Sequence, residues 1–143
     1  MIEFKKIGID ELQSIANYLL ENKGNVEKVI SDFGNIEINN GYGTIFLQPI
    51  NQLFKVISIY SSDGQIISVG FGGPHLGLSL ESLLYAYNLN SDGFVPYDND
   101  HVYVFYSSEN IQYTIKITSK NKLLENGKII NNIPINDFVI TMK

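Results

Sequence analysis

The spacing of apolar residues changes along the chain, and this change constrains the fold more than any other feature. Before Ile36, apolar side chains recur every three or four residues, which is the period of an amphipathic helix. From Ile36 they mostly alternate, as in strands with one buried face, and the helical period returns only over residues 80–87. Because few helices separate the strands, parallel βαβ winding is not indicated. The pattern predicts an α+β fold, with a mainly antiparallel sheet of about six to eight strands and two or three helices packed on one face.

Local signals predict where the first two helices begin and end. Asp10 would cap the first helix, with Gln13 in the reciprocal capping-box position. Gly24 would end that helix in a left-handed conformation. The second helix would begin after Asn25 as its cap and end at Gly34.

Turn sequences separate the predicted strands. Asp-Gly at 63–64 and Asn-Gly at 126–127 favour tight hairpin turns, and residues 39–43 form a third turn sequence. Residues 53–60 are apolar on both faces, which predicts a central strand. Residues 138–142 predict a further strand that can close the sheet.

Size and composition indicate one domain, residues 1–143, in a cytoplasmic protein. A chain of 143 residues with 44% hydrophobic residues can bury a substantial core. The absence of cysteine excludes disulfides and thiolate chemistry. The first six residues lack the apolar stretch of a signal peptide, and no apolar run is long enough to span a membrane.

The charge balance favours some partners over others. The formal net charge is −5, and all ten cationic side chains are lysines. Arginine is the preferred residue for bidentate phosphate and base contacts, so its absence from an acidic chain argues against nucleic-acid binding. The same acidity suits a basic protein partner.

A glycine-rich loop at residues 72–79 has the two glycines and terminal serine of a phosphate-binding loop. Leu78 occupies the position where the lysine is needed, and Pro74 removes an amide donor. We therefore expect no nucleotide cofactor. The glycines are interpreted as a sharp turn from sheet to helix, with Ser79 as the helix cap.

Residues 88–99 partly match a calcium-binding EF-hand loop. Position 1 is the neutral Asn88, and position 12 is Asn99, where a bidentate glutamate is needed. We therefore expect no metal site.

A catalytic base is the remaining enzymatic alternative. The chain has two histidines, His75 and His101. His101 lies close in sequence to Asp98 and Asp100, either of which could orient it. We expect no enzyme, because no activated nucleophile motif accompanies them.

Residues 88–100 and the preceding tyrosine are the predicted binding site. Aromatic anchors surrounded by carboxylates would suit a basic partner. The alternative is a solvated loop whose aromatic side chains fold back onto the core. The predicted partner-binding residues are Tyr87, Asp92, Phe94, Tyr97, Asp98 and Asp100.

In its compactness, acidity, lack of cysteine and lack of a catalytic motif, the chain is similar to the small bacterial immunity proteins of polymorphic toxin systems. The similarity is one of general type and assigns no individual residue. It implies tight binding to a cognate toxin domain, for which a basic nuclease is one candidate. Two alternatives stay open: a homo-oligomeric accessory domain that self-associates through strands at 102–106 and 111–117, and a small enzyme using His101.

Overall fold

The structure is a computed structural model that describes most of the chain. At 95–97, 102–106, 124 and 128–129 it describes the backbone only. The described residues are 3–73, 78–89, 95–97, 102–106, 112–119, 121, 124–125, 128–130 and 134–143.

The described elements are three α-helices, two short 3-10 helices and ten strands. The helices are η1 (Phe4–Lys6), η2 (Ile9–Glu11), α1 (Leu12–Asn22), α2 (Val26–Phe33) and α3 (Leu80–Ala86). The strands are β1 (Gly34–Asn39), β2 (Thr44–Pro49), β3 (Val56–Ser62), β4 (Gln65–Gly72), β5 (Val95–Tyr97), β6 (Val102–Tyr106), β7 (Tyr113–Thr118), β8 (Leu124–Glu125), β9 (Lys128–Ile129) and β10 (Asp137–Met142).

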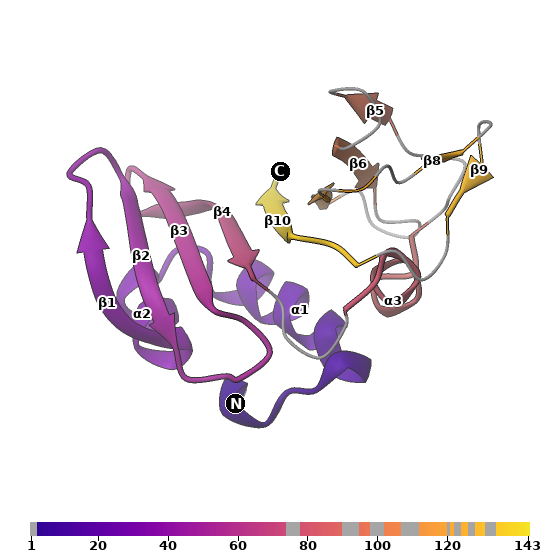
Figure 1. Cartoon of the computed structure of the whole chain (residues 1–143). Helices are drawn as coiled ribbons and strands as arrows, with labels where there is room; N and C mark the ends of the chain where they lie inside the picture. The colour runs from indigo at the N-terminus through magenta and orange to yellow at the C-terminus, as the bar shows by residue number, and fades with distance from the viewer. Residues whose placement is uncertain are drawn as a thin grey trace.

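Eight of these strands form one sheet in the order β1-β2-β3-β4-β10-β7-β6-β5, while β8 and β9 pair separately. All the strand pairs are antiparallel. The C-terminal strand β10 lies in the middle of the sheet, where it joins the meander β1–β4 to the meander β5–β7 (Figure 1). The antiparallel α+β fold predicted from the sequence is confirmed.

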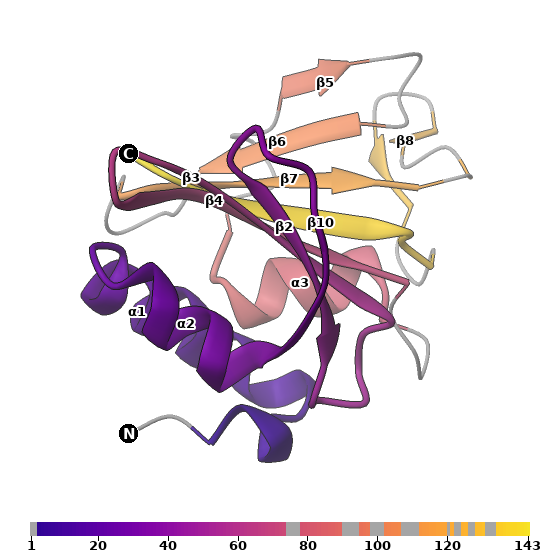
Figure 2. The same cartoon turned by 90° about the vertical axis from the view of Figure 1, so that its left-hand side faces the viewer.

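The three α-helices lie on the same side of the sheet (Figure 2). Buried apolar residues of the helices and of the sheet form one core cluster. The sheet contributes alternate residues, including Ile57 and Ile59 of β3 and Ile115 and Ile117 of β7, all fully buried. Aromatic rings join the meander β1–β4 to β10, since Phe71 of β4 stacks on Phe138 of β10 with 5.0 Å between ring centroids. The alternation seen in the sequence therefore marks the buried face of the sheet.

Several local predictions are confirmed. The Asn25 side chain caps α2 by accepting a hydrogen bond from the Lys28 amide, and Gly34 ends the helix. Ser79 caps α3 in a capping box with Ser82. Glycine is also required at Gly34 for space, because a Cβ there would lie 2.2 Å from the Gln48 carbonyl oxygen.

Turns across the sheet also follow the sequence. The Asp63–Gly64 turn has positive φ at both residues, 53° and 74°. In the turn at residues 39–43, Gly41 and Gly43 have positive φ. The strands β8 and β9 pair as a hairpin on either side of 126–127, which lies outside the described residues.

Two predictions about the first helix are wrong. Asp10 lies in η2, and α1 begins at Leu12 without a side-chain cap. The 3-10 turn therefore replaces the expected capping box. The helix has its C-cap at Lys23, and Gly24 does not adopt a positive φ.

The predicted strand at 53–60 begins later than expected, at Val56. Asn51 accounts for the difference because it holds the preceding turn. Its side chain accepts a hydrogen bond from the Leu53 amide and donates to the backbone carbonyls of Phe4 and Ile7. Leu53 and Phe54 are buried in this turn and not in the strand.

The suggested self-association edge is also wrong. The strands β6 and β7, which include Val102–Tyr106 and most of residues 111–117, each have a neighbour on both sides. The described ends of the sheet are β1 and β5.

Candidate functional site

A cleft of about 750 Å³ opens on the helical side of the protein, between η1, α1 and the start of α2. It lies within the size range of ligand and partner sites, but its lining is mostly polar. The lining residues are Glu3, Lys6, Ile7, Glu11, Ser14, Asn17, Tyr18, Glu21, Asn22 and Lys28.

The charges of this cleft are unevenly compensated. Lys6 pairs with Glu3 at 2.9 Å, and Lys28 pairs with Asp32 at 2.8 Å. Both lysines of the lining are therefore engaged by carboxylates of the chain itself. The carboxylates of Glu11 and Glu21 form no ion pair with the described residues. The cleft therefore has a net negative lining.

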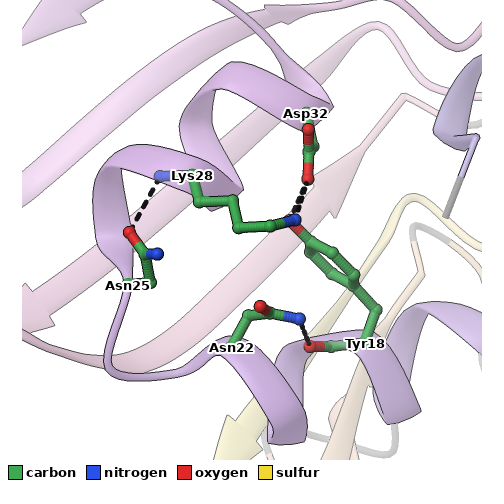
Figure 3. Close-up of polar contacts among 5 residues, drawn as sticks. All are labelled: Tyr18, Asn22, Asn25, Lys28 and Asp32. Carbon is green, nitrogen blue, oxygen red and sulfur yellow. Dashed lines mark hydrogen bonds and ion pairs between the residues drawn. The ribbon is translucent and has the colours of Figure 1, made fainter. Parts of the chain in front are cut away.

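Tyr18, Lys28 and Asp32 form a polar cluster that joins α1 to α2 (Figure 3). The Tyr18 hydroxyl donates a hydrogen bond to Oδ2 of Asp32. Nζ of Lys28 donates to the same oxygen at 2.8 Å and lies 5.0 Å from the centre of the Tyr18 ring. The Tyr18–Asp32 hydrogen bond and the cation–π contact thus hold the two helices together beside the cleft, while the Lys28–Asp32 pair lies within α2.

Local sequence explains how these side chains meet. Lys28 and Asp32 are four residues apart on α2, so they share one face of the helix. The Asn25 cap fixes the first turn of α2, and the Asn22 side chain donates to the Tyr18 carbonyl at 2.9 Å (Figure 3). The Tyr18 ring also packs against Phe33, at 5.4 Å between ring centroids.

These contacts shift two pKa values in opposite directions. The hydrogen bond from Lys28, followed by that from Tyr18, lowers the pKa of Asp32. Burial, followed by the hydrogen bond to Asp32 and its negative charge, raises the pKa of Tyr18. At neutral pH Asp32 is ionised and Tyr18 is a neutral donor. The cluster is therefore suited to holding the cleft in shape.

The sequence-predicted binding residues are not brought into this cleft. Tyr87 is 1% exposed, and its ring packs against Phe138 and Tyr113 in the core. It therefore cannot present an exposed anchor in this structure, which agrees with the alternative that an aromatic folds back onto the core. Burial raises its pKa, and its hydroxyl has no hydrogen-bond partner among the described residues.

The other predicted residues are largely undescribed. The backbone of Tyr97 belongs to β5 at the end of the sheet, while its side chain is not described. The remaining members of the predicted site and both histidines lie outside the described residues, so their roles stay predictions. These residues are Asp92, Phe94, Asp98, Asp100, His75 and His101.

Sequence reasoning missed the cleft, although part of its signal was present. Glu11, Ser14, Tyr18 and Glu21 recur at spacings of three or four residues, which places them along one polar face. Opposite charges four residues apart, as in Lys28 and Asp32, are a further signal of a salt-bridged helix face. Neither pattern reveals that two helices meet there.

Two classes of site are absent from the part of the chain that the structure describes. In that part, no group of three or more histidine, aspartate or glutamate side chains is placed to hold a metal ion. No helix within it is both long and apolar enough to cross a membrane.

Comparison with known proteins adds no family assignment. No protein-family model matches the chain, and neither a curated protein nor a solved structure shows significant similarity to it.

Proposed function

We propose that this protein is a binding module, and specifically a cytoplasmic immunity protein that binds and neutralises a cognate bacterial toxin domain. The observation that carries the proposal is the cleft at α1, whose two lysines are paired within the chain while Glu11 and Glu21 remain without ion pairs among the described residues. Such a lining is complementary to lysine or arginine side chains of a partner.

The net charge of the whole chain also favours a basic protein partner. A net charge of −5 without arginine attracts a basic protein and repels nucleic acid. A nuclease toxin has a basic surface where it binds its substrate, so an acidic inhibitor can compete for that surface. Electrostatic attraction would mainly accelerate association.

The geometry of the cleft favours binding over catalysis. Tyr18 and Asp32 hold each other in protonation states that suit a fixed hydrogen bond. A wall fixed before the partner arrives reduces the entropic cost of binding. The acidic segment at residues 88–100 would supply a second contact, through Asp92, Phe94, Tyr97, Asp98 and Asp100.

The proposal is tested by co-expressing the chain with the product of the neighbouring gene, as the toxin candidate, and measuring growth of the host. We expect growth to be restored, and the purified pair to associate more slowly as ionic strength rises. Absence of both rescue and binding would overturn the proposal for that pair.

Charge-neutral variants then locate the interface. Replacing both Glu11 and Glu21 with glutamine should weaken binding about tenfold, since each removes one charge pair with the partner. Glu27→Gln on α2 is the matched control, because Glu27 is exposed but does not line the cleft. Asp98→Asn with Asp100→Asn tests the second contact, and unchanged affinity would remove that segment from the interface.

A further inference from the structure

Large exposed apolar side chains lie at the β1–β2 hairpin, whereas the lining of the cleft is mostly polar. Ile38 of β1 is 58% exposed, Tyr42 in the turn is 88% exposed, and Tyr60 of the neighbouring β3 is 41% exposed. Clusters of exposed apolar residues mark interaction sites more often than single ones do.

The strand register places these side chains together. Ile38 is opposite Phe46, and Phe46 is opposite Ser58, two residues before Tyr60 on the same face of β3. Their neighbours Leu47 and Ile57 are buried, so the alternation points Phe46 and Tyr60 to the face away from the helices.

Tyr42 lies in the turn between β1 and β2, beside these side chains. The ring of Tyr60 lies 3.3 Å from the position that a Cβ on Gly43 would take, so the turn rests on this ring. We call the set Ile38, Tyr42, Phe46 and Tyr60 the hairpin surface.

The edge strand beside this surface is not built to pair with itself. The register shifts between Ile36 and Ile38, which makes Glu37 an extra residue that interrupts the ladder. Bulges and charges of this kind protect sheet edges from indiscriminate pairing. A second copy would also bring two Glu37 carboxylates together between two chains of net charge −5.

Glu37 is also the only charged residue between residues 34 and 49. The hairpin surface therefore combines one carboxylate with aromatic and aliphatic side chains, and a complementary occupant combines cationic and apolar groups. β1 lies at an end of the sheet, so such an occupant can approach it from outside (Figure 1).

We propose that the hairpin surface docks a segment of another protein in which apolar side chains alternate with lysine or arginine. This inference rests on the proposed function for its basic partner, but it depends on residues that are not part of the cleft. In the docked state a cation faces Glu37, and apolar side chains cover Ile38 and Tyr60.

The probe for this inference is a blocked octapeptide of alternating valine and lysine, titrated into the isotope-labelled protein and followed by NMR. We expect the largest amide shifts at residues 36–46 and at Tyr60. Ile38→Ser should weaken binding about tenfold, as for truncation of an interface anchor. Tyr85→Ser is the control, because Tyr85 is an exposed aromatic residue on α3 and not on the strands of the hairpin surface.

A charge exchange tests the role of Glu37. Glu37→Lys should weaken the affinity for the lysine peptide about tenfold. The same variant should bind more tightly to a peptide with glutamate in place of lysine. Tyr42→Ala, at an exposed turn position, provides a second variant that does not alter the edge strand.

Other outcomes overturn the inference. Amide shifts confined to the cleft residues would leave the proposed function intact and remove the hairpin surface from it. Dimerisation of the wild type that Ile38→Ser abolishes, measured by sedimentation, would show that the occupant is a second copy. Unchanged affinity in both Ile38→Ser and Tyr42→Ala would likewise exclude the hairpin surface.

Discussion

Two tyrosines are buried in the helical layer, and their surroundings differ. Tyr18 on α1 is 6% exposed and packs on Phe33, while its hydroxyl donates to Asp32. Tyr87, at the end of α3, is 1% exposed and packs near Phe138, while its hydroxyl has no partner among the described residues. Figure 2 shows α3 and the α1–α2 pair on the same side of the sheet.

The comparison separates two uses of a buried aromatic residue. At α1 the hydroxyl is part of the wall of a cleft, and its hydrogen bond offsets the loss of hydration. At α3 the ring packs in the core and its hydroxyl has no partner among the described residues, and a buried hydroxyl without a partner costs about 1–3 kcal/mol in the folded state.

The largest expected effect is a loss of stability at alkaline pH, to which both tyrosines contribute. Each pKa is raised above its ordinary value of 10.0. A raised pKa in the folded state gives stability that is present below pH 10 and is lost as the pH rises above it, because the unfolded chain ionises first. By pH 11, one pH unit above the ordinary pKa, the phenol is mostly ionised in the unfolded chain but not in the folded one. We therefore expect each of the two tyrosines to lower the free energy of unfolding by about 1 kcal/mol at pH 11.

This effect is measured by urea unfolding between pH 7 and 11. The double variant Tyr18→Phe with Tyr87→Phe should lose less stability over this range than the wild type does. Tyr42→Phe is the matched control, because Tyr42 is exposed. Parallel profiles for the wild type and the double variant would contradict the buried state of both hydroxyls.

The next effect separates the two tyrosines at neutral pH. Tyr18→Phe removes a hydrogen bond to an ionised carboxylate, which should lower the free energy of unfolding by about 1.5 kcal/mol. Because Asp32 keeps Lys28 as a partner, the loss should be at the lower end for a charged acceptor. Urea unfolding at pH 7 measures it, and a neutral result would show that the Tyr18 hydroxyl does not stabilise the α1–α2 contact.

The opposite sign is expected at α3. Tyr87→Phe removes a buried hydroxyl that has no described partner, and it should raise the free energy of unfolding by about 1 kcal/mol. The same urea measurement compares it directly with Tyr18→Phe. Destabilisation would show that the Tyr87 hydroxyl is hydrogen-bonded, and the contrast between the two tyrosines would then disappear.

What the sequence predicted reflects how local each interaction is. Asn25 and Ser79 were identified as caps because each bonds an amide three residues away. The position of β10 between β4 and β7 joins segments distant in sequence, so no local pattern reports it.

The candidate site was harder to predict for the same reason. Tyr18 and Asp32 are 14 residues apart on different helices, and their contact depends on how the helices pack. In the sequence, Tyr87 belongs to an apolar helical stripe and also stands beside an acidic loop. The first position predicts a buried side chain and the second an exposed one, and only the fold shows that Tyr87 is buried. The acidic loop itself stays a prediction.

The smallest expected effect concerns Asp32 and acidic pH. Its pKa is lowered from 3.8, first by the hydrogen bond from Lys28. A lowered pKa in the folded state gives stability that is present above the ordinary value and is lost as the pH falls through the lowered one. Since the Lys28 and Asp32 side chains are 37% and 23% exposed, solvent screening limits this contribution to about 0.5 kcal/mol.

Asp32→Asn tests this contribution, because asparagine keeps an oxygen that can accept the Tyr18 hydrogen bond but has no charge. In urea unfolding from pH 7 to 2.5, the wild type should be the more stable protein above about pH 5, and the difference should shrink below pH 4. Glu27→Gln on the exposed side of α2 is the control for general loss of a carboxylate. A difference that stays constant to pH 2.5 would mean that the negative charge of Asp32 does not contribute to the stability of the α1–α2 contact.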